Sequence, residues 1–143
     1  MILVDTNVVS ETMRRAPDAR VIEWFDAQSP GSVYLSAVSL AELLFGIALL
    51  PDGRRKQALD AGLGDRLAAL FGENVLPFDS EAARAYARIV AEARQAGVAI
   101  GVADGQIAAT AAANNLVIAS RDTAPFRAAG LAVIDPWTAA TLD

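Results

Sequence analysis

Ile2-Leu3-Val4-Asp5-Thr6-Asn7 is the stretch that decides the fold, because an uninterrupted apolar run ends there in a carboxylate, a hydroxyl and an amide. A short run that is apolar at every position is typical of a strand buried on both faces, as at the centre of a parallel sheet. We therefore predict a strand over residues 2–5, with Asp5 at its carboxyl end.

The rest of the chain alternates short apolar runs with longer helical patterns. Further strands are predicted over residues 33–35, 74–76, 116–120 and 131–134. Helices are predicted over residues 7–15, 18–28, 39–50, 79–95, 102–115 and 123–129, and over 53–72 with an interruption near Gly62 and Gly64. Strands separated by helices form right-handed crossovers, so we expect an α/β fold in three layers, with helices flanking a central parallel sheet of about five short strands. No repeat or linker interrupts the pattern, and one domain is expected over residues 1–143.

The composition excludes several classes of catalytic site. The chain contains no His and no Cys, so it can build neither a Ser-His-Asp or Cys-His nucleophile nor a His- or Cys-ligated zinc site. Its only lysine is Lys56, and neither a GxxxxGK[ST] loop nor a GxGxxG turn is present. Any chemistry must therefore come from carboxylates, hydroxyls, amides, arginines or a bound hard cation.

Charge and hydropathy bear on partners and compartment. The formal net charge of −5 argues against a nucleic-acid-binding surface, since phosphate backbones are bound through basic groups. The mean hydropathy of +0.34 is high, but no run is long and apolar enough to predict a membrane span. The first residues lack the pattern of a secretory signal, so we expect a cytoplasmic protein with no membrane partner.

Three carboxylates, Asp5, Glu42 and Asp104, stand alone within apolar stretches. A lone carboxylate in a buried stretch is unfavourable unless it is paired or binds a cation. Asp5 and Asp122 each follow a predicted strand, and Glu42 and Asp104 fall in the first turn of predicted helices. All four are therefore expected in the crevice where open α/β sheets bind ligands. Gathered there, they would raise one another's pKa unless a cation neutralised them, and an all-oxygen set favours Mg²⁺ or Mn²⁺.

Each carboxylate also has a purely structural interpretation. Ser39-x-x-Glu42 has the pattern of a capping box, and Asp104 suits the positive end of a helix dipole. Asp5 could cap the helix that follows it, and Asp122 could be an ordinary loop residue. Because all four carboxylates are expected at one edge of the sheet, we favour a metal site over four separate structural roles.

The carboxylates lie in four segments: Ile2-Leu3-Val4-Asp5-Thr6-Asn7-Val8, Ser39-Leu40-Ala41-Glu42-Leu43, Ala103-Asp104-Gly105-Gln106-Ile107-Ala108-Ala109 and Ala119-Ser120-Arg121-Asp122. In this order, and with the closing Val133-Ile134-Asp135-Pro136-Trp137, they resemble the PIN-domain nucleases. Within that family the chain is most similar to the VapC-like toxins of bacterial type II toxin–antitoxin pairs. The resemblance covers essentially the whole chain.

The resemblance implies a PIN-like fold and a metal-dependent endoribonuclease. Asp5, Glu42, Asp104 and Asp122 would be catalytic and would bind Mg²⁺ or Mn²⁺, although the family commonly has either Asp or Asn at the last position. Thr6, Asn7 and Ser120 would be the polar support of the site. In such a site the metal lowers the pKa of a water that hydrolyses the RNA phosphodiester.

The resemblance also implies partners. The substrate would be RNA, the chain would form a homodimer, and a cognate antitoxin would fill the acidic groove with its tail. Antitoxins of this group often bind DNA, so DNA would be contacted only indirectly. Bound metal would turn the acidic cluster into a cationic surface, so the net charge of −5 does not exclude binding of RNA. Several arginines could guide the RNA backbone: Arg14, Arg15, Arg54, Arg55 and Arg121.

Two other classes of function remain open at this point. A Mg²⁺-dependent phosphatase or phospho-acceptor domain would use Asp5 as its nucleophile. Such enzymes generally need a second Asp two positions on and a Lys in the site, whereas this chain has Asn7 there and only Lys56. A non-catalytic binding module on the same fold is the third possibility.

Overall fold

Strand β1 (Ile2–Val4) lies at the centre of a five-stranded sheet whose order is β3-β2-β1-β4-β5. The computed structural model describes residues 1–138, and every strand pair in it is parallel. The other strands are β2 (Val33–Ser36), β3 (Val75–Leu76), β4 (Val117–Ala119) and β5 (Val133–Ile134). The predicted α/β class with a central parallel sheet is confirmed.

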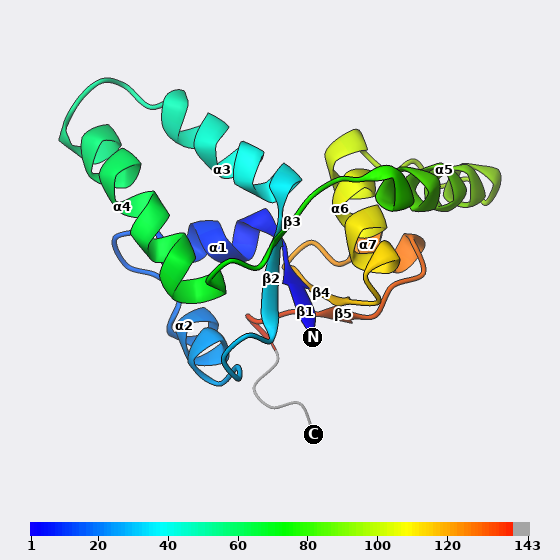
Figure 1. The fold of residues 1–143 in the computed structure, drawn as a ribbon, viewed down its shortest axis with the longest axis horizontal. Coiled ribbons are helices and arrows are strands. Elements are labelled where there is room, and N and C mark those ends of the chain that lie inside the picture. The colour runs from blue at the N-terminus through cyan, green and yellow to red at the C-terminus, as the bar shows by residue number, and fades with distance from the viewer. Residues whose placement is uncertain (139–143) are drawn as a thin grey trace.

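Helices cover both faces of the sheet. In Figure 1, α1 to α4 lie on one side of the sheet and α5 to α7 on the other. Their bounds are α1 (Thr6–Thr12), α2 (Ala19–Asp26), α3 (Ala37–Ala48), α4 (Arg54–Phe71), α5 (Ser80–Gln95), α6 (Val102–Ala113) and α7 (Ala124–Ala128). None of these helices is both long and apolar enough to cross a membrane.

The side chains of β1 alternate between two separate cores, as a strand buried on both faces must. Ile2 and Val4 pack in a cluster that contains Trp24 of α2. Leu3 packs in the opposite cluster, which contains Ile107 of α6. The two clusters hold helices against both faces of β1 and so fix the position of its carboxyl end.

The strand order places that carboxyl end at a topological switch point. From β1 the sheet grows through β2 to β3 on one side and through β4 to β5 on the other. In open α/β sheets, the crevice outside the strand ends at such a point is where ligands bind. Helix α1 begins directly after β1, and α3 begins directly after β2, so two helix N-termini lie at this edge.

The start of α3 differs from the prediction. The helix begins at Ala37, because β2 runs into it without a loop, and Ser36 is its N-cap. The Ser36 Oγ accepts a hydrogen bond from the Ser39 N–H at 2.9 Å. The alternative interpretation of Ser39 and Glu42 as a capping box is therefore wrong, and so is the expected place of Glu42 in the first turn of the helix, since it is in the second turn of α3.

Helix α4 is continuous, whereas an interruption near Gly62 and Gly64 was expected. Both glycines are exposed, and a Cβ at either position would meet no other atom. Leu63 and Phe71 are buried on the inner side of the helix, and this packing outweighs the low helix propensity of glycine.

Helix α1 is shorter than predicted and ends at Thr12. The guanidinium of Arg66 on α4 donates a 3.0 Å hydrogen bond to the Thr12 carbonyl oxygen. A tertiary contact therefore satisfies this carbonyl group at the end of the helix.

Candidate functional site

All four predicted carboxylates line one cavity at the carboxyl edge of the sheet. Its volume is about 490 Å³. The lining residues are Asp5, Thr6, Asn7, Ser10, Glu11, Arg14, Glu42, Asp104, Arg121, Asp122 and Trp137. They come from α1 and the residues after it, from α3 and α6, and from the segments after β1, β4 and β5, so residues distant in sequence meet at the topological switch point.

Asp5 is the most buried of the four carboxylates, with 6% of its surface exposed. It is the N-cap of α1, and its Oδ1 accepts a 2.8 Å hydrogen bond from the Thr6 N–H. Its Oδ2 accepts a 2.7 Å hydrogen bond from the Ser120 hydroxyl. The capping role predicted as an alternative is real, and Asp5 lines the cavity as well.

A polar network joins α1 to the end of β4. The Ser120 Oγ lies 3.3 Å from the Asn7 side-chain amide and 3.1 Å from the Asp122 N–H, both of which can donate to it. The Arg121 N–H donates to Asn7 Oδ1 at 3.3 Å. Asn7 and Ser120 therefore hold the loop after β4 against α1.

Thr6 is the third residue that was predicted to support the site, and it holds the Glu42 side chain. The Thr6 hydroxyl donates a 2.7 Å hydrogen bond to Glu42 Oε1 and so joins α1 to α3. Glu42 is nonetheless exposed. Its carboxylate therefore has free lone pairs at the cavity.

Asp104 is in the first turn of α6, as predicted. The following residue, Gly105, is buried, and a Cβ there would lie only 2.8 Å from the Tyr86 ring on α5. Gly105 thus permits the close approach of α6 to α5, which fixes the start of α6 and with it the position of Asp104.

The carboxylates are coupled electrostatically. Burial raises the pKa of Asp5 from 3.8 to about 6, and the negative charges of Asp104 and Glu42 add to this, although the hydrogen bonds from Ser120 and Thr6 oppose it. The pKa of Asp104 is also raised, first by burial and then by the charges of Asp122 and Glu42. A cation in the cavity would relieve both effects.

The donor set fits a hard divalent cation, because every available ligand is an oxygen. Within residues 1–138, however, no three acidic side chains are spaced closely enough to hold an ion as they stand. Glu42 and Asp122 are both exposed, so side-chain rotation can bring their carboxylates toward the more buried Asp5 and Asp104. The chemistry of the site therefore fits Mg²⁺ or Mn²⁺, and ligation by three or more of the carboxylates requires these rotations.

Three residues of the cavity were not predicted from the sequence: Ser10, Glu11 and Trp137. Glu11 is 6% exposed and accepts hydrogen bonds from the Arg14 side chain at 3.3 Å and the Asp18 N–H at 3.0 Å. Arginines follow it closely in sequence, so no pattern separates it from a solvated charge. Trp137 was quoted only for the resemblance, and its place beside the acidic site is decided by the return of β5 to the sheet.

The lysine that a phospho-acceptor site generally needs is absent from the cavity. Lys56 is on α4 and donates to the Ala48 carbonyl oxygen at 3.1 Å. None of the residues that line the acidic cavity is a lysine.

Comparison with known proteins places these features in a family. Residues 2–131 match the family described as PIN domain. The chain is 51% identical over 138 residues to the VapC ribonuclease Y4jK of Sinorhizobium fredii, an alignment that covers 96% of this chain and 98% of the relative. It is 47% identical over 137 residues to the toxin FitB of Neisseria gonorrhoeae, with 96% and 99% covered.

Solved structures share the fold. FitAB bound to an IR36 DNA fragment superposes with a TM-score of 0.91 at 43% identity, over 100% of this chain and 98% of that one. VapBC complexes, some of them with bound DNA, also have this fold. The chain therefore belongs to the PIN-domain family and, by its identity with VapC and FitB proteins, to the VapC-like group within it.

Proposed function

We propose that residues 1–143 form a single PIN-like domain that acts as a metal-dependent endoribonuclease and as the toxin of a toxin–antitoxin pair. The observation that carries this proposal is the cavity at the switch point, where carboxylates from four separate segments meet and where the pKa of Asp5 is raised to about 6. The identity with a VapC ribonuclease supports the same reaction.

Asp5, Glu42, Asp104 and Asp122 would hold Mg²⁺ or Mn²⁺. When bound, the ion would supply a water of lowered pKa and would neutralise charge that develops on the phosphate. Before this, the carboxylates must lose their protons, and the Ser120 and Thr6 hydrogen bonds to Asp5 favour its ionised form. Thr6 also orients Glu42 through the 2.7 Å hydrogen bond. Asn7 and Ser120 hold Asp122 at the cavity through the loop after β4.

The proposed partners follow from the family. We propose that the chain forms a homodimer and that a cognate antitoxin blocks the acidic cavity, with DNA bound only through the antitoxin. FitAB and VapBC complexes with bound DNA support the proposal of a protein partner through which DNA is bound. An RNA substrate implies action in the cytoplasm.

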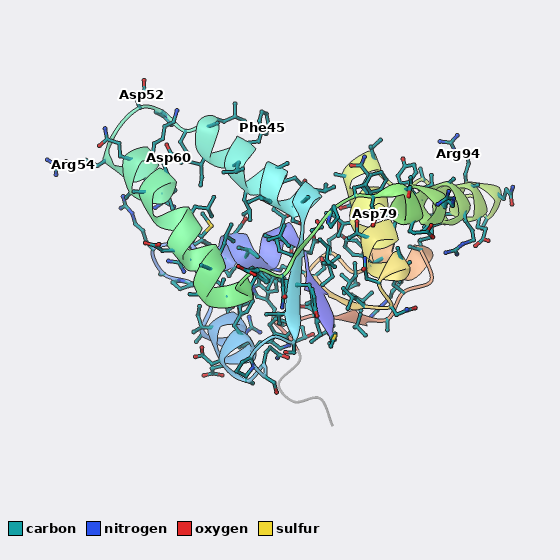
Figure 2. All side chains as sticks on the ribbon, in the orientation of Figure 1. Phe45, Asp52, Arg54, Asp60, Asp79 and Arg94 are labelled. Carbon is teal, nitrogen blue, oxygen red and sulfur yellow. The ribbon has the colours of Figure 1, made fainter. Side chains whose placement is uncertain are left out.

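The test is cleavage of total bacterial RNA by the purified chain, free of antitoxin, with Mn²⁺ and with EDTA. We expect discrete fragments that require the metal and that disappear in the Asp104→Asn variant. Asp60→Asn is the matched control. The substitution removes the same charge, and Asp60 lies on α4 away from the cavity (Figure 2). Cleavage by Asp104→Asn at the wild-type rate would refute the site assignment.

Direct binding of Mn²⁺ separates the other classes of function. A chain that binds no Mn²⁺ and cleaves no RNA would be a binding module on the PIN-like fold. A phosphoryl group trapped on Asp5 would support the phospho-acceptor reading.

A further inference from the structure

Arg121 is fixed at both ends at the edge of the acidic cavity. It follows β4 between Ser120 and Asp122, and its backbone N–H is bound to Asn7 Oδ1 on α1. Its guanidinium carbon lies 4.9 Å from the centre of the Trp137 ring, which is the geometry of a cation–π contact. The side chain of Arg121 is therefore held in one position although it is exposed.

Trp137 is a rigid support for this guanidinium. It is 5% exposed and belongs to the core cluster that includes Val4 of β1. Its backbone N–H donates to Asp135 Oδ1 at 2.9 Å, which fixes the turn after β5. A guanidinium on an aromatic face keeps its N–H edge free, and this edge matches two oxygens of a phosphate.

The N–H groups of the Arg121 side chain are not used by the protein. Within residues 1–138 they form no hydrogen bond and no ion pair, although five carboxylates line the same cavity. Arg14 also lines the cavity, but its guanidinium is bound to the buried carboxylate of Glu11 at 3.3 Å. Of these two arginines, Arg121 is the one whose donors are available to a ligand.

We propose that Arg121 binds an RNA phosphate next to the one that is cleaved, and that Trp137 positions it for this contact. The inference rests on the proposed function, in which the carboxylates and their metal hold the scissile phosphate. RNA carries a phosphate at every nucleotide, so a neighbouring phosphate falls near the edge of the cavity. This phosphate does not change in the reaction, and the contact therefore stabilises the bound substrate and the transition state equally.

The first measurement is the affinity for a short fluorescein-labelled single-stranded RNA of mixed sequence, by anisotropy in Ca²⁺ at several salt concentrations. Loss of one charge-assisted contact in Arg121→Gln is expected to weaken binding about tenfold. The slope of log K against log salt should also decrease by about 0.7, as for one phosphate contact with a single strand. Arg94→Gln is the control for charge alone, since Arg94 lies at the far end of α5 (Figure 2).

The second measurement tests the role of Trp137 as a positioning residue. Trp137→Phe keeps an aromatic ring but weakens the cation–π contact, so we expect a smaller loss of RNA affinity. In the Arg121→Gln background, the same change should lower RNA affinity no further, although it should lower the Tm as it does in the wild type. A purely structural role of Trp137 would instead reduce affinity equally in both backgrounds.

Cleavage in Mn²⁺ completes the test. Arg121→Gln should raise KM about tenfold and leave kcat nearly unchanged. RNA binding by Arg121→Gln with wild-type affinity and salt slope would overturn the inference, and so would a wild-type chain that binds no RNA. A wild-type chain that binds RNA through Arg121 but cleaves none would refute the proposed nuclease and leave the phosphate contact standing.

Discussion

The Ser120 hydroxyl donates a 2.7 Å hydrogen bond to Asp5 Oδ2, although 115 positions separate the two residues in sequence. The bond exists because β1 and β4 are adjacent parallel strands, with Val4 opposite Ala119, so that the next residue of each strand lies at the same edge. It favours the ionised form of Asp5 and thereby opposes the effect of burial on the pKa of that carboxylate.

Replacement of Ser120 by Ala should move the pH dependence of cleavage to higher pH. Without the hydroxyl, the pKa of Asp5 rises above its value of about 6, and more of the carboxylate is protonated at neutral pH. Rates measured in Mn²⁺ across pH 5 to 8 would show the shift. The control is Ser10→Ala, which removes a hydroxyl from the same cavity but not one bound to Asp5. An unchanged profile for Ser120→Ala would mean that Asp5 does not limit the activity.

Without metal, the protein should become less stable as the pH rises through about 6. The folded-state pKa of Asp5 is about 6 and its unfolded value is 3.8, so the folded state binds the proton more tightly and stability is greatest below the unfolded value. The loss by pH 7 is on the order of 3 kcal/mol. The raised pKa of Asp104 acts in the same direction. Thermal denaturation in EDTA at pH 5 and pH 7 measures the part of this loss that lies between these pH values, about 1 kcal/mol, and Asp5→Asn should remove most of it.

Protonation of Asp5 stabilises the folded protein as the pH falls, and protonation of Asp18 should limit this stabilisation at low pH. The Arg20 side chain lowers the pKa of Asp18 to about 2, so this group stabilises the fold above its unfolded pKa and loses its contribution as the pH falls toward 2. The unfolding free energy of the metal-free protein should therefore pass through a maximum near pH 4, the unfolded-state pKa that the two groups share. In Asp18→Asn, the decline on the acid side should be less steep.

Addition of Mn²⁺ at pH 7 should raise the Tm by several degrees, because a bound cation removes the repulsion and the burial cost that raise the pKa of Asp5 and Asp104. In EDTA, Asp104→Asn should be at least as stable as the wild type, because it lacks one of the repelling charges. Differential scanning calorimetry with and without metal measures both effects. An Asp104→Asn variant that unfolds at a much lower temperature would show that Asp104 has a structural role instead.

Glu42→Gln should abolish cleavage with little change in stability. Glu42 is exposed and does not cap α3, since Ser36 has that role. Ser36→Ala, in contrast, should cost about 1 kcal/mol of stability through loss of the N-cap. Urea denaturation of the two variants compares these costs. A loss of similar size in Glu42→Gln would show that the hydrogen bond from Thr6 to Glu42 stabilises the fold.

Local sequence was sufficient to predict most of the secondary structure and to single out carboxylates that line the cavity. An all-apolar strand that ends in Asp5, and isolated acidic residues at Glu42 and Asp104, are features of neighbouring residues, and burial penalises unpaired charge wherever it occurs. The start of α3 and the continuity of α4 were not accessible in this way. The first depends on a strand that passes directly into a helix, and the second on packing of Leu63 and Phe71 against the rest of the protein.

The sequence by itself determined the class of the fold, the strand ends and the residue types available for chemistry, because these depend on hydrophobic periodicity and composition. Only the tertiary structure decided that β4 lies beside β1, so that Ser120 reaches Asp5, and that Glu11 and Trp137 line the same cavity. Strand order and the return of the chain to the sheet depend on the joint packing of two cores on opposite faces of β1. The two residues of such a contact, for example Ser120 and Asp5, never lie in the same stretch of sequence.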